Sequence, residues 1–88
     1  MTTTDILKER LAALDPVRLD ILDDSAKHAG HASARGGGHY RVLIVSPRFE
    51  GLGTMARHRL VYDAVGNLMD GEIHALSITA RTPAEQAP

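Results

Sequence analysis

The chain has 88 residues, no cysteine and a formal net charge of −1, divided into −3 over residues 1–24 and +2 over residues 25–88. A chain of this length forms one small domain, and without cysteine it makes neither a disulfide nor a thiolate metal site of its own. Its three aromatic residues exclude a platform of several stacking rings for single-stranded nucleic acid, and the mild charge asymmetry permits an anionic partner without requiring one.

The N-terminal segment predicts a helix followed by a strand. In TTTDILKERLAAL the leucines recur at the spacing of one helix face, and a threonine with Asp5 supplies the N-cap region. We expect this helix to end at Asp15-Pro16, because the residue before a proline avoids the helical region. VRLDIL, residues 17–22, then alternates apolar and polar residues, which predicts a half-buried strand. Its inward-facing residues are Val17, Leu19 and Ile21.

The remaining segments complete a mixed α+β pattern. HYRVLIVS (39–46) predicts a buried strand that pairs antiparallel with the first one. PRFEGLG is a turn, TMARHRLVYDAVGNLM (54–69) is a helix, and EIHALSITA (72–80) is a third strand that a helical crossover allows to run parallel to the second. TPAE fits the capping box of a short final helix. We therefore predict an α+β fold with the order α-β-β-α-β-α and a three-stranded mixed sheet with helices packed on it.

The pattern of the N-terminal stretch and the lengths of the apolar runs bear on the expected location. MTTTDILKERL has no apolar signal core, and no apolar run approaches the length of a membrane span. We expect a single domain over 1–88 with flexible ends at 1–4 and 86–88, a cytoplasmic location and no membrane partner.

Three of the five histidines lie in the glycine-rich stretch KHAGHASARGGGHY. His28 and His31 have a spacing that can place two nitrogens on one metal, but two histidines are half of a zinc sphere, and solvated loop histidines fit the pattern as well. His39 opens a strand and is expected to be a capping or strand-edge residue. The glycines precede a strand and no lysine follows them, so this stretch is a connection and not a phosphate-binding loop.

His74 shares strand parity with Leu76 and Ile78, which predicts that its ring faces the apolar side of the sheet. A polar ring in that position needs a partner. Two interpretations stay open from the residues alone: a hydrogen-bonded residue at the edge of the core, or a ligand directed across the sheet toward the glycine-rich loop.

The triplet RHR begins the second helix. Arg57 and Arg59 are expected to point outward, where they would contact phosphate or an acidic partner or be solvated, and His58 is expected to lie half-buried at the edge of the apolar stripe. No nucleophile has a base and a carboxylate arranged with it in the sequence, so we expect no enzyme activity.

Several of these stretches together resemble the BolA family. SPRFEGLGTMARHRLVYDAV is similar to its signature, GEIHALSITARTP to its C-terminal strand and tail, and DDSAKHAGH leading to GGGHYRVLIVS to its histidine-type variable loop. The resemblance implies a fold similar to the type II KH fold. One departure is Gly53, where the family commonly has serine or threonine as the helix cap; Thr54 is the alternative cap.

The resemblance further implies partnership with a monothiol glutaredoxin around one shared [2Fe–2S] cluster. The glutaredoxin and glutathione would supply thiolates, and this chain would supply His74 and the loop histidine His28, with His31 as the alternative loop ligand. The isolated chain would then hold no cofactor and be a monomer or weak dimer.

The competing class is DNA binding, because family members are also described as transcription regulators of stress response and cell morphology. Arg57, His58 and Arg59 would carry that contact. A DNA-binding regulator is therefore the alternative function.

Overall fold

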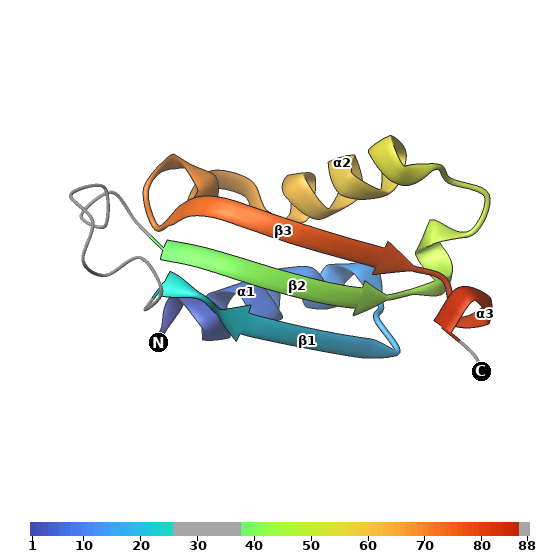
Figure 1. Ribbon diagram of the computed structural model, residues 1–88, viewed down its shortest axis with the longest axis horizontal. Helices are drawn as coiled ribbons and strands as arrows, with labels where there is room; N and C mark the ends of the chain where they lie inside the picture. Colours follow the sequence, from blue (N-terminus) through green and yellow to red (C-terminus); the bar gives the residue numbers. More distant parts are fainter. Residues whose placement is uncertain (26–37, 87–88) are drawn as a thin grey trace.

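The structure is a computed structural model that describes residues 1–25 and 38–86. Its elements follow the predicted order, with short 3-10 turns between them (Figure 1). They are α1 (Thr3–Leu11), η1 (Ala12–Leu14), β1 (Arg18–Asp23), β2 (Gly38–Val45), η4 (Pro47–Phe49), α2 (Thr54–Val65), η5 (Gly66–Asp70), β3 (Ile73–Arg81) and α3 (Pro83–Gln86).

The first helix has its N-cap in the region that the sequence predicts, and its α-helical part ends at Leu11, where η1 continues the turn. The Thr2 hydroxyl accepts the backbone N–H of Asp5 at 3.1 Å, and the Asp5 carboxylate accepts the backbone N–H of Thr2 at 3.2 Å, which forms a capping box. Thr2 caps α1 and the next two threonines begin it, within the range 1–4 that the sequence analysis expects to be a flexible end. The chain leaves the helical path at Asp15, whose φ is 51°.

The three strands form one mixed sheet in the order β1-β2-β3. β1 pairs antiparallel with β2, and β2 pairs parallel with β3, as the sequence predicts. Leu19 and Ile21 turn toward the core, but Val17 precedes β1 and is 67% exposed, so its predicted inward position is wrong. Within the ranges described, no helix has the length and apolar character needed to cross a membrane.

Both long helices cover the same face of the sheet (Figure 1). Leucines of α1 and valines of α2 join inward-facing residues of β2 and β3 in one cluster around Phe49, which is fully buried. The buried members are Leu7, Leu11, Leu14, Tyr40, Val42, Ile44, Phe49, Val61, Val65, Leu68 and Ile73. The opposite face of the sheet carries the alternate side chains and faces away from α1 and α2; we call it the open face.

The second helix is shorter than the predicted range 54–69. Gly53 is its N-cap and supplies no side-chain hydrogen bond, so Thr54 does not take over as the cap. The α-helix ends at Val65 because Gly66 adopts a φ of 62°, and η5 continues the turn. The Arg10 guanidinium of α1 donates to the Val65 carbonyl at 2.6 Å and to Asn67 Oδ1 at 2.9 Å, which ties α1 to the end of α2.

Candidate functional site

The structure brings two histidines together at the N-terminal ends of the parallel strands β2 and β3. The rings of His39 on β2 and His74 on β3 have their centroids 5.2 Å apart and are tilted by 40°. His74 is exposed and His39 is half-buried. Imidazole is a common metal ligand. Here two imidazoles lie close together on strands, which fix their backbone positions.

The predicted inward orientation of His74 is wrong, and an irregularity in the strand pairing explains why. Gly38 pairs with Ile73, but the next residue, His39, pairs with Ala75, so His74 is the extra residue of a β-bulge. A bulge interrupts the alternation of side chains. Ile73 is therefore buried, whereas His74 lies outside the core beside His39.

Local hydrogen bonds hold His39 in place. Its backbone N–H donates to Ser25 Oγ at 3.0 Å, and its carbonyl accepts the Asp24 N–H at 2.7 Å. Ser25 in turn hydrogen-bonds to Asp23, and these bonds lower the pKa of the Asp23 carboxyl. Gly38 approaches closely here, because a Cβ on it would lie 2.6 Å from a Tyr40 ring carbon and 2.7 Å from Ser25 Oγ. The turn from β1 and the start of β2 thus fix the backbone of His39.

The predicted loop ligands His28 and His31 lie outside the described residues. Over 1–25 and 38–86, no three His, Cys, Asp or Glu side chains form a group that could hold a metal ion. The described part of the site therefore consists of the His39–His74 pair, which is fewer donors than a metal ion requires.

The expectation that Arg57 points outward is wrong. Its guanidinium donates to the Leu52 carbonyl at 2.8 Å, to the Ala80 carbonyl at 3.1 Å, and to both carboxylate oxygens of Glu85 at 2.6 and 3.1 Å. Its side chain is only 14% exposed. The hydrogen bonds from Arg57, together with the backbone N–H of Thr82, lower the pKa of Glu85 from 4.5 to about 2. Arg57 thus joins α2, the end of β3 and α3.

The other two residues of the RHR triplet lie as expected. Arg59 is exposed and His58 is half-buried, and both line an open hollow of about 330 Å³ on α2. Thr54, Met55 and Tyr62 complete its lining. This hollow belongs to α2, the layer behind the sheet, and contains neither His39 nor His74.

The family model described as "BolA-like protein" matches residues 11–85. The chain belongs to the BolA family. BolA1 from Arabidopsis thaliana, a solved structure, has a TM-score of 0.82 and 43% identity, with 94% of each chain covered. The BolA-family relatives include "Protein BOLA1, chloroplastic" of Arabidopsis thaliana, which is 45% identical over 90% of this chain and 52% of that protein.

A second Arabidopsis relative is "SufE-like protein 1, chloroplastic/mitochondrial", which is 44% identical over 90% of this chain and 23% of that protein. The chain therefore spans about half, or less, of the length of these two curated BolA-family relatives.

Sequence reasoning missed the pairing of His39 with His74. One signal was available: Tyr40 points into the core, so strand alternation turns His39 to the open face. The bulge at His74 left a weaker signal: Ile73 is apolar but has the opposite strand parity from Leu76 and Ile78.

Proposed function

We propose that this BolA-family chain is an adaptor that shares a [2Fe–2S] cluster with a monothiol glutaredoxin and contributes imidazole ligands. The observation that carries the proposal is the exposed His74 ring beside His39, with centroids 5.2 Å apart. An exposed histidine on a bulge contributes little to a core but is accessible to a second molecule. The proposal assigns no catalytic step to this chain.

The donor chemistry fits a shared cluster. The sequence has no cysteine, and clusters of this kind are held by cysteine thiolates with histidine as the common replacement. The thiolates would come from the glutaredoxin and glutathione, and His74 with a second imidazole would come from this chain. When bound, a cluster with imidazole ligands has a less negative charge and a higher reduction potential than one with thiolates alone.

The identity of the second imidazole is part of the proposal. The family resemblance assigns it to His28, with His31 as its neighbour. His39 is a third candidate, because its ring already lies next to His74 on a rigid strand. The name of the SufE-like relative also points toward iron–sulfur handling for a protein that contains a BolA-like segment.

The test is a titration of this chain into a monothiol glutaredoxin loaded with [2Fe–2S] and glutathione, followed by visible absorption and circular dichroism. We expect a one-to-one complex with an altered cluster spectrum for the wild type and no spectral change for His74→Ala. Single His28→Ala, His31→Ala and His39→Ala variants identify the second ligand by the same loss.

His58→Ala is the matched control, since it removes an imidazole from α2 and should bind like the wild type. A wild-type titration that leaves the cluster spectrum unchanged would overturn the proposal, as would equal loss with His58→Ala.

DNA binding is the second candidate, favoured by the exposed Arg59 beside the half-buried His58. It is the weaker candidate because the guanidinium of Arg57 donates its hydrogen bonds to acceptors within the fold. Binding to phosphate should weaken steeply as salt rises, whereas ligation by histidine should not.

We propose a cytoplasmic protein that is a monomer or weak dimer when isolated.

A further inference from the structure

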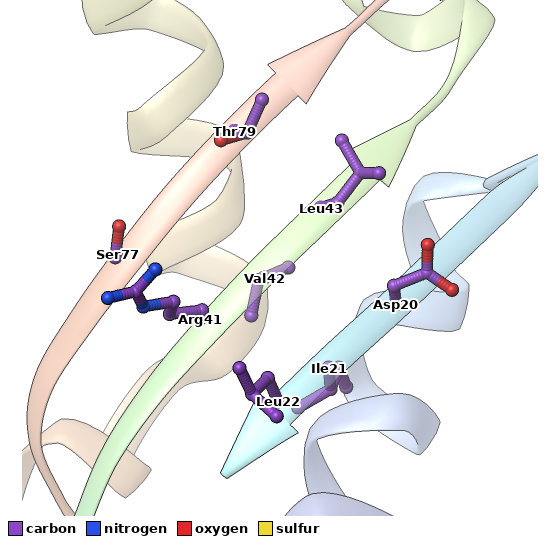
Figure 2. Close-up of a pocket in the computed structure, with 8 residues that line it drawn as sticks. All are labelled: Asp20, Ile21, Leu22, Arg41, Val42, Leu43, Ser77 and Thr79. Atoms are coloured by element: carbon purple, nitrogen blue, oxygen red, sulfur yellow. The ribbon is translucent and has the colours of Figure 1, made fainter. Parts of the chain in front are cut away.

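The open face forms continuous rows of side chains that lead away from the histidine pair. The strand register places Leu22, Arg41 and Ser77 side by side across β1, β2 and β3. The next row is formed by Asp20, Leu43 and Thr79. Figure 2 shows these side chains on the strands, with the helices behind them. His39 precedes the first of these rows by two residues on β2, which is the spacing of one strand face.

Two hollows connect the histidine end with the middle of the open face. One, of about 220 Å³, is lined by Asp24, His39, Arg41 and Ser77 together with Tyr40 and Ala75. The other, of about 280 Å³, is the one in Figure 2 and is also lined by Arg41 and Ser77. The two hollows adjoin at these two residues, and together they extend along the open face from His39 to the Asp20 row; we call the pair the trough.

The trough is lined by both apolar and polar side chains. Leu22 is 54% exposed although it lies within a strand, and Leu43 is half-buried beside it. Arg18 is paired with Asp20 at 2.8 Å, and Arg41 with Asp24 at 3.1 Å. Non-obligate protein interfaces are mixed in this way, and arginine is enriched in them.

We propose that the open face, with the exposed Leu22 of the edge strand β1, is the docking surface for the same thiolate-donating protein that meets His74. This inference rests on the proposed function. A thiolate and an imidazole on one cluster bring the two proteins into contact at His74, but a specific complex buries about 800 Å² on each partner. The contact must therefore extend over neighbouring surface, and the trough is continuous with His39 on the face that the helices leave uncovered.

The occupant fitted by this chemistry is the glutaredoxin surface around its cluster cysteine, with an apolar side chain that covers Leu22 and polar groups that meet the two ion pairs. The two arginines and two carboxylates of these ion pairs already neutralise one another, so covering them leaves no unpaired charge among these four groups. Met55 on α2 is even more exposed, at 79%, but belongs to the other layer and is predicted to stay outside the complex.

The test compares Leu22→Glu with the matched control Met55→Glu, since each places one carboxylate at an exposed apolar residue. Affinity for the cluster-loaded monothiol glutaredoxin is measured for each full-length chain, and thermal unfolding checks that both variants fold. We expect Leu22→Glu to weaken binding about tenfold or more and Met55→Glu to change it less than about twofold.

A second measurement, with wild-type protein only, follows amide chemical shifts as the loaded glutaredoxin is added. The shifts should concentrate on Leu22, Arg41, Leu43 and Ser77 and not on α2. This measurement does not depend on whether a variant folds. Unchanged affinity for Leu22→Glu, or shifts confined to α2, would overturn the docking surface and leave the shared cluster intact. A wild type that does not bind the loaded glutaredoxin overturns both proposals, and the two failures are thereby distinguished.

Discussion

β3 has a polar cluster at each end, and the two clusters use their side chains differently. At the end of the strand, Arg57 donates to two backbone carbonyls and to both carboxylate oxygens of Glu85, within the fold. At its start, His74 lies on a bulge, exposed, with its ring next to that of His39. The comparison shows that the charged Arg57 is a structural residue that connects α2, β3 and α3, whereas the exposed imidazole of His74 is accessible to a second molecule.

The largest effect should come from breaking the connector end. Arg57→Ala removes the donors to Leu52, Ala80 and Glu85 at once. We therefore expect a larger drop in thermal stability than for Gly38→Ala, Glu85→Gln or His74→Ala. Arg57→Lys should restore little, since an ammonium group cannot donate in the planar fork that this site uses. Arg59→Ala, its exposed neighbour, should stay within about 0.5 kcal/mol of the wild type in urea unfolding. Equal stability of the two alanine variants would show that Arg57 is not a connector.

The histidine end should be sensitive in its backbone. Gly38→Ala would place a Cβ 2.6 Å from Tyr40 and 2.7 Å from Ser25, so both side chains, or the backbone at Gly38, must shift. We expect a loss of about 1–3 kcal/mol of unfolding free energy, the usual range for overpacking. Gly71→Ala is the control, because a Cβ there has nothing within 4 Å. If the two variants are equally stable, the close approach at Gly38 does not exist.

The pH dependence of stability should report on the connector end. The folded-state pKa of Glu85 is lowered from 4.5 to about 2. Its contribution to the free energy of unfolding is therefore fully present above pH 4.5 and is lost as the pH falls through about 2. Glu85→Gln should therefore reduce the loss of stability in that pH range, measured as urea midpoints. A wild-type acid profile that the substitution leaves unchanged would contradict the ion pair.

The smallest effect on stability is expected at the residue proposed to matter most for function. His74→Ala should change the free energy of unfolding by no more than about 0.5 kcal/mol, because His74 is exposed and lies outside the core. Urea unfolding measures this directly. A large loss of stability would make His74 a structural residue like Arg57.

The sequence predicts most of this fold and only part of the candidate site. Apolar spacing predicts the leucine face of α1 and the buried β2, because the core imposes these periods. The connections between the strands predict the pairing of both neighbours with β2. The orientation of His74 is not predictable in this way, since the bulge shifts the alternation by one residue. The outward orientation expected of Arg57 fails for a different reason: its acceptors lie on Leu52, Ala80 and Glu85, and only the fold brings the last two close.

The most direct test of the central proposal detects the ligand nitrogen itself. The chain is labelled with ¹⁵N-histidine, combined with the unlabelled [2Fe–2S] glutaredoxin and glutathione, reduced, and studied by pulsed EPR. We expect a strong hyperfine coupling to ¹⁵N that disappears in His74→Ala and persists in His58→Ala. A reduced cluster in the wild-type complex with no ¹⁵N coupling would contradict it.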